Sequence, residues 1–151
     1  MARPLAALAL AFAASLVCAG ARADKAFDKT FPLPMAGGVI AVNATVGPVV
    51  ITYVDVRNAP NKADFDKAKA NPGESCRPKF QVRLSNPGAD KVKVKLIVKL
   101  ESASGSTLLS CDTGEKLKPG TKDFDSNLCW LQGLHVNDWP NAKLHLIVTA
   151  D

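Results

Sequence analysis

Hydrophobic and polar residues alternate along Lys79–Glu101, which reads KFQVRLSNPGADKVKVKLIVKLE. Successive side chains of a strand point to opposite faces, so this period of two predicts two half-buried strands. Between them, Asn86–Asp90 contains the Pro and Gly that favour a tight turn. We predict a hairpin with one apolar and one basic face, and a wet face implies an antiparallel sheet. The apolar face comprises Phe80, Val82, Leu84, Val92, Val94, Leu96, Val98 and Leu100.

Similar patterns on both sides of this stretch predict further strands. Turn residues separate them at fairly even spacing, which is typical of a β-sandwich. We therefore expect residues 24–151 to form a single all-β domain, an antiparallel, immunoglobulin-like β-sandwich of about seven strands. Segments 24–37 and 112–127 are predicted to be a surface segment and a polar loop. The additional strands are predicted at Gly38–Val46, Val49–Val56, Thr107–Cys111, Leu128–Val136 and Lys143–Ala150.

The run Val82–Val94, VRLSNPGADKVKV, resembles the signature hairpin of immunoglobulin-like extracellular modules of the CARDB and fibronectin III type. In those modules a V-x-L-x-N-x-G turn joins two alternating strands. The resemblance implies a sandwich in an adhesive or structural setting, and a shared fold does not by itself specify an activity.

A long, Pro-containing connection, Arg57–Pro78, precedes the hairpin. Within it, Ala63–Ala70 predicts a short helical insert with Asn61 or Asp64 as its N-cap. Connections of this length are often functional. We interpret it as a crossover between the two sheets, with a binding loop as the alternative.

Residues 1–23 have the features of a cleaved signal peptide. Arg3 gives a positive start, Leu5–Val17 is apolar, and Ala21–Ala23 fits a small-x-small cleavage site. The apolar run is shorter than the roughly 20 residues of a membrane-spanning helix. The Ala-rich leader predicts a bacterial protein that is secreted or periplasmic, with no transmembrane segment in the mature chain.

Charge gives little indication of a partner. Removing residues 1–23 takes away two arginines and no acid, which leaves 17 Lys and Arg against 14 Asp and Glu. So small an excess, without a recognition motif, argues against a nucleic-acid partner. The oligomeric state stays open.

Three cysteines remain after the leader is removed: Cys76, Cys111 and Cys129. Export makes a disulfide plausible, and three cysteines allow one bridge and one leftover thiol. We predict Cys111–Cys129, while Cys76–Cys111 and Cys76–Cys129 remain open.

Two features could bind a partner. Lys91, Lys93, Lys95 and Lys99 form a row on one face of the second hairpin strand, which suits an anionic surface. The alternative is a solvated face that guards a sheet edge. Trp139, in an Asn-Asp-Trp-Pro turn, is predicted to be exposed and able to stack on a ligand, whereas Trp130 is predicted to face inward.

Catalytic and metal-binding patterns are weak. The chain has no Gly-x-Ser-x-Gly element, no local Cys/His signature and no paired acid and base, so we predict no enzyme and no cofactor. A copper or zinc site would require His135 and His145 to converge with Cys129, Asp138 or Met35.

These observations predict an exported, non-catalytic binding or structural module, used in cell-envelope adhesion or assembly. Its expected partner is a protein or glycan of the envelope. One alternative is a carrier of a small ligand or metal ion. Another is a periplasmic hydrolase inhibitor, in which the 57–78 connection would plug an active site.

Overall fold

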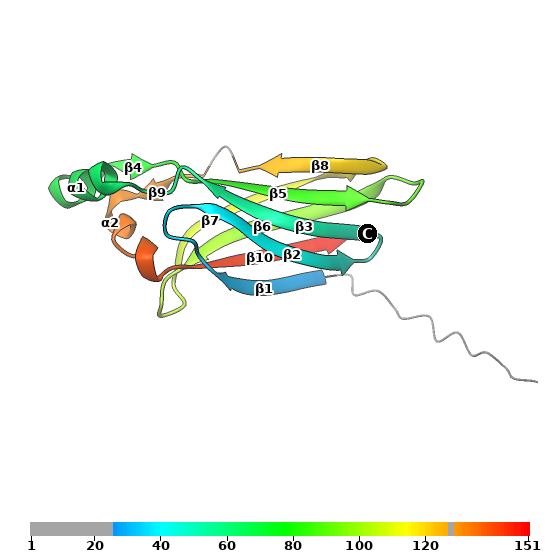
Figure 1. Ribbon diagram of the computed structural model, residues 1–151, viewed down its shortest axis with the longest axis horizontal. Coiled ribbons are helices and arrows are strands. Elements are labelled where there is room, and N and C mark those ends of the chain that lie inside the picture. The colour runs from blue at the N-terminus through cyan, green and yellow to red at the C-terminus, as the bar shows by residue number, and fades with distance from the viewer. Residues whose placement is uncertain (1–25, 127–128) are drawn as a thin grey trace, which may run out of the picture.

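The computed structural model describes residues 26–126 and 129–151. Two four-stranded antiparallel sheets form its body, which confirms the predicted sandwich (Figure 1). The strand orders are β1-β10-β6-β7 and β2-β3-β5-β8, and β4 and β9 form a small third sheet. The strands are β1 Ala26–Pro32, β2 Gly38–Val46, β3 Val49–Arg57, β4 Ser75–Cys76, β5 Lys79–Asn86, β6 Val92–Glu101, β7 Thr107–Leu117, β8 Gly120–Asp125, β9 Leu131–Gln132 and β10 Lys143–Ala150.

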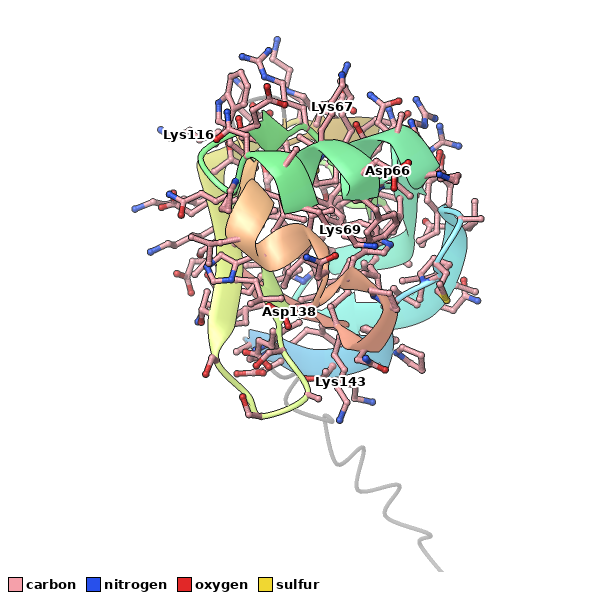
Figure 2. The ribbon with its side chains drawn as sticks, turned by 90° about the vertical axis from the view of Figure 1, so that its left-hand side faces the viewer. Asp66, Lys67, Lys69, Lys116, Asp138 and Lys143 are labelled. Atoms are coloured by element: carbon pink, nitrogen blue, oxygen red, sulfur yellow. A yellow bond between two sulfur atoms is a disulfide. The ribbon has the colours of Figure 1, made fainter. Side chains whose placement is uncertain are left out.

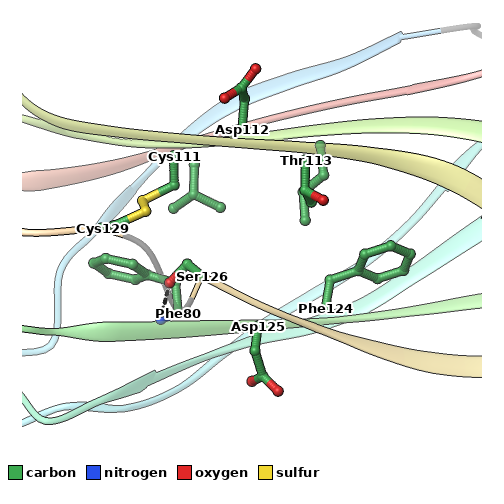
Figure 3. A pocket seen from close by; sticks show the side chains of 10 residues that line it. Phe80, Cys111, Asp112, Thr113, Phe124, Asp125, Ser126 and Cys129 are labelled. Atoms are coloured by element: carbon green, nitrogen blue, oxygen red, sulfur yellow. Dashed lines mark hydrogen bonds between the residues drawn. A yellow bond between two sulfur atoms is a disulfide. The ribbon is translucent and has the colours of Figure 1, made fainter.

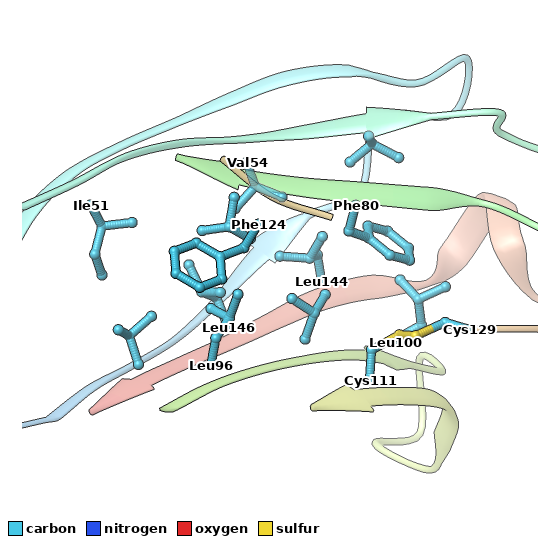
Figure 4. Close-up of a cluster of buried hydrophobic side chains, with 14 of the residues drawn as sticks. Ile51, Val54, Phe80, Leu96, Leu100, Cys111, Phe124, Cys129, Leu144 and Leu146 are labelled. Carbon is cyan, nitrogen blue, oxygen red and sulfur yellow. A yellow bond between two sulfur atoms is a disulfide. The ribbon is translucent and has the colours of Figure 1, made fainter. Parts of the chain in front are cut away.

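The core lies between the two large sheets. Alternate residues of β3, β5, β6 and β10 point into it, as the period of two predicts. Figure 4 shows Ile51 and Val54 facing Leu144 and Leu146, all of them fully buried. Burial of each such side chain contributes about 1.5–3 kcal/mol.

The predicted hairpin is wrong in its pairing. Both arms alternate as expected, but β5 pairs with β3 and β8, whereas β6 pairs with β10 and β7. The connection is therefore an arch between sheets. Buried Asn86 organises it: its Oδ1 accepts a bond from the Gly88 N–H at 3.0 Å, and its Nδ2 donates to the carbonyls of Asp90 and Leu117 at 2.7 and 3.2 Å. The alternation of apolar and polar residues determines which face of a strand is buried, but it does not determine which strand lies beside it.

Two segments at the periphery that were predicted to be non-strand contain strands. The segment 24–37 contains β1, which pairs with β10, and the loop 112–127 contains the end of β7 and all of β8. The described residues thus form ten strands rather than seven. These outer strands are mostly polar; in β1 only Phe27 is buried. Asn127 and Leu128 lie outside the described residues.

The helical insert is confirmed. Helix α1, Lys62–Ala70, begins at Asn61, whose Oδ1 accepts bonds from the N–H groups of Ala63 and Asp64 at 2.8 and 3.2 Å. Asp64 accepts in return from the Asn61 N–H at 2.9 Å, which completes a capping box. The predicted crossover is wrong, because the connection joins β3 and β5, antiparallel neighbours in one sheet.

One end of the sandwich is covered by α1, β4, β9, the short helix α2 (Gly133–Val136) and the 3₁₀ helix Trp139–Asn141 (Figures 1 and 2). The predicted strand Leu128–Val136 is wrong, since β9 spans two residues before α2 begins. Gly133 makes this turn possible: its N–H donates to the Glu74 carbonyl at 2.5 Å, and a Cβ there would lie 2.6 Å from that oxygen.

Candidate functional site

A cavity of about 290 Å³ opens between β7 of one sheet and β8 of the other. We call it the slot (Figure 3). Its floor is apolar because it is formed by inward-facing core residues. This volume is about twice that of an engineered apolar cavity that binds benzene. The residues that line it are Phe80, Leu96, Val98, Cys111, Asp112, Thr113, Phe124, Asp125, Ser126 and Cys129.

The mouth of the slot is polar. Thr113 occupies an inward position of β7, between Cys111 and Glu115, yet its side chain is exposed. Figure 3 shows Asp112 and Asp125 on the two lips, pointing away from the cavity on opposite outer faces. Among the described residues that line the slot, these two acids are the only charged ones.

Two cross-links hold β7 near the opposite side of the slot. The predicted disulfide Cys111–Cys129 is present, with a Cα–Cα distance of 5.8 Å. Further along β7, the Glu115 carboxylate pairs with the Lys122 ammonium of β8. The disulfide therefore bounds the slot at one end and the Glu115–Lys122 ion pair bounds it at the other. The side chains of this ion pair are half exposed.

Ser126 fixes the far wall. Its Oγ accepts a hydrogen bond from the Phe80 N–H at 2.8 Å, and its own N–H donates to the Phe80 carbonyl at 3.0 Å. Next to this, Arg83 of β5 forms a bidentate pair with Asp123 of β8, with both N···O distances at 2.7 Å. The Arg83 hydrogen bonds lower the pKa of Asp123, so this pair keeps β8 attached to β5 on the outer face.

The predicted lysine row lies on the outer face of β6. Lys93 and Lys95 are exposed and Lys99 is half-buried, whereas Lys91 precedes the strand. β6 lies between β10 and β7, so these lysines do not guard a sheet edge, although the exposure of Lys93 and Lys95 agrees with a solvated face. Lys116 of β7 lies opposite Lys93 and extends the basic row, but Glu101 and Asp112 share the same face.

Both tryptophan predictions are wrong. Trp139 is 1% exposed, because it begins the 3₁₀ helix at the covered end and its indole N–H donates to the Met35 carbonyl at 3.0 Å. Trp130 is 46% exposed, since it precedes β9 outside the two large sheets. The Arg77 guanidinium lies 3.2 Å from the centroid of the Trp130 ring. Trp139 is therefore a packing residue.

The histidines occupy separate settings. His145 of β10 contacts Asp28 of β1 through Nε2 at 2.5 Å and Glu101 of β6 through Nδ1 at 2.7 Å. His135 lies 3.6 Å from Asp138. The part of the chain that the structure describes contains no group of three or more His, Cys, Asp or Glu placed to hold a metal ion.

Cys76 is the free cysteine among the described residues, and it is half-buried beneath α1. Burial, together with the Asp64 carboxylate, raises the pKa of its thiol to about 11. A thiol with so high a pKa is protonated at neutral pH and is a poor nucleophile.

The sequence interpretation missed most of the slot, although a signal was present. The alternation that begins at Leu109 continues through Cys111, Thr113 and Glu115 to Leu117. Polar residues at the inward positions concealed the strand, because a buried face was expected to be apolar. Of the lining residues, the two cysteines were predicted as a disulfide, and Phe80, Leu96 and Val98 were predicted only as core residues.

Comparison with protein-family models and with curated proteins gives no match. The predicted signal peptide, residues 1–23, lies outside the described residues. Within residues 26–126 and 129–151, no helix has the length and apolar character needed to cross a membrane.

Proposed function

We propose that this chain is an exported, non-catalytic binding module of the bacterial cell envelope, and that it binds its partner at the slot. The observation that carries the proposal is an apolar cavity that opens between β7 and β8, the outer strands on one side of the sandwich. Pockets of about this size with an apolar lining and a few polar groups are the usual sites of recognition. Adhesion or assembly within the envelope is the setting that the leader and the disulfide favour.

The chemistry of the described side chains supports binding rather than turnover. The slot is lined by two acids on its outer lips and by Ser126 and Thr113, with no His or Lys among its lining residues. Both carboxylates point away from the cavity, so neither hydroxyl has a base directed toward it. The protonated Cys76 thiol, at the covered end, adds no nucleophile.

A small-ligand carrier is the second candidate, and the volume of the slot favours it. About 290 Å³ accommodates a compact apolar molecule of one or two rings. The hydrolase-inhibitor alternative stays a prediction: α1 and its capping box make the 57–78 connection an ordered insert, but no observed contact indicates a protease or other enzyme as its target.

Site-specific photocross-linking in cells tests the proposal. A benzophenone side chain placed at Thr113 lies at the mouth of the slot, whereas the same group at Thr107 lies at the other end of β7. We expect a discrete adduct with an envelope component at position 113 and none at position 107. Adding Val98→Trp, which fills the floor, should remove the adduct. Equal labelling at both positions, or an adduct that survives slot filling, would contradict a binding role for the slot.

A further inference from the structure

The outer edge of β7 is free along a long strand. β7 extends over 11 residues, and among the described residues its only strand neighbour is β6. The backbone N–H and C=O groups on its other edge are therefore available to another extended chain. Addition of a strand to such an edge is a recurring mode of peptide recognition.

The slot lies directly inside this free edge. Cys111, Thr113 and Glu115 face inward from β7, and Thr113 remains exposed because no neighbouring strand covers it. A chain paired with β7 would direct every second side chain toward the same interior, above Leu96 and Phe124. Apolar side chains at those positions would fill the cavity, and the main-chain bonds would hold their register.

The intervening side chains of such a strand would lie on the outer face beside Asp112. On β6, the residue opposite Asp112 is Ile97, which is apolar and carries no charge to pair with it. On its other side Asp112 faces the free edge, where an added strand would lie. Asp125 gives the second lip the same sign of charge. Cross-strand pairs of opposite charge stabilise a sheet. A basic side chain therefore suits the outward position beside Asp112; Lys116, four residues further along β7 on the same face, does not add to this preference.

We propose that the slot receives an extended segment of an envelope protein in which apolar and basic residues alternate, and that this segment pairs with β7 as a fifth strand of the β1-β10-β6-β7 sheet. This inference rests on the proposed function and names the partner at the same site. The backbone bonds supply affinity and the slot selects the apolar side chains.

A pair of modified peptides separates strand addition from simple filling of the cavity. The probe is an eight-residue peptide of alternating valine and lysine with blocked ends, titrated into the purified, processed protein. One version is N-methylated at the valines and the other at the lysines. In a paired strand only one of these two sets of N–H groups faces β7, so one version should lose at least about tenfold in affinity and the other little. Equal effects of the two modifications overturn the inference.

Protein variants test the position and the charge. Thr113→Trp should abolish peptide binding, whereas Thr107→Trp on the same strand should not. Asp112→Asn should weaken binding about threefold, while Asp90→Asn, an exposed acid in the β5–β6 arch, should leave it unchanged. A peptide of alternating valine and glutamate should bind more weakly than the lysine peptide; equal binding removes the charge argument.

The outcomes separate this inference from the proposed function. Toluene that binds the slot, together with a valine–lysine peptide that does not, would overturn strand addition and favour the small-ligand carrier. A cross-link at position 113 in cells would then still support binding. Failure of the peptide, of toluene and of the cross-link would overturn both. In a complex formed as we propose, hydrogen exchange should slow at the β7 amides that do not bond to β6.

Discussion

The two long sides of the sandwich are both formed by outer strands of the two sheets, but they differ in the side chains at the inward positions. On the β1–β2 side, the inward positions hold Phe27, Phe31, Ile40 and Ala44, which pack against the core. The rings of Phe27 and Phe31 lie 6.3 Å apart. This side is closed.

On the β7–β8 side, the corresponding positions hold Thr113, Glu115 and Lys122. Their polar groups remain in contact with water, because burying a polar group without a partner is unfavourable. The sheets are held together here by the disulfide and one ion pair in addition to the packing of Leu109, Leu117 and Phe124. A few side chains on the outermost strands thus decide whether a side of the sandwich closes, and the open side is the candidate binding site.

The largest expected effect comes from a matched pair of core truncations. Leu146→Ala should lower the free energy of unfolding by about 3–5 kcal/mol. Leu146 is fully buried near the closed side, so its truncation leaves a cavity in a tightly packed interior. Leu96→Ala, on the floor of the slot, should cost about 2 kcal/mol, because that side chain already borders open space. Urea unfolding monitored by fluorescence measures both. Equal losses would show that the slot is as well packed as the rest.

A smaller effect is expected from pH on the strand that forms the closed side. The carboxylates of Asp28 and Glu101 raise the pKa of His145, which they contact from β1 and β6. Protonated His145 therefore stabilises the fold fully below the ordinary histidine pKa of about 6.5, and this stabilisation is lost as pH rises through the raised value.

NMR titration of the His145 ring should give a midpoint above that of an unfolded histidine. The free energy of unfolding should fall across the same pH range in the native protein, and His145→Asn should remove that part of the pH dependence. A midpoint at or below about 6.5 would contradict the arrangement seen around the ring.

The smallest effect is expected at the ion pair of the open side. Glu115→Gln should change the free energy of unfolding by less than about 1 kcal/mol, because the Lys122 and Glu115 side chains remain 47% and 35% exposed. A double-mutant cycle with Lys122→Met measures the coupling. A coupling energy well above 1 kcal/mol would mean that the pair closes the slot more firmly than its exposure suggests.

Strand faces could be predicted from the sequence because the core strands alternate strictly. Every apolar residue chosen on the Lys79–Glu101 stretch is buried. The α1 cap was predictable for a similar reason: Asn61 and Asp64 have the spacing of a local motif, which needs no knowledge of the rest of the chain.

Pairing and the slot depended on contacts between distant segments. Asn86 indicates a turn, but it does not show whether the chain returns to the same sheet. That depends on β3 and β10, which pair with β5 and β6 respectively. The predicted exposures of Trp130 and Trp139 were the reverse of those observed, because the exposure of each depends on where the covered end of the sandwich begins. Thr113 and Glu115 continue the alternation of Leu109 and Cys111, but they are polar, so an inward-facing strand was not recognised.

The pairing of β1 with β10 has a consequence for biosynthesis. Ala26 lies opposite Thr149, so the first strand of the described chain completes its ladder only with the last. β10 also separates β1 from β6, so β1 has no strand partner and β6 has only β7 until β10 has left the ribosome. Such distant contacts give a high contact order and slow folding, on the order of milliseconds to seconds. Until then the β1-β10-β6-β7 sheet lacks the strand that joins β1 to β6.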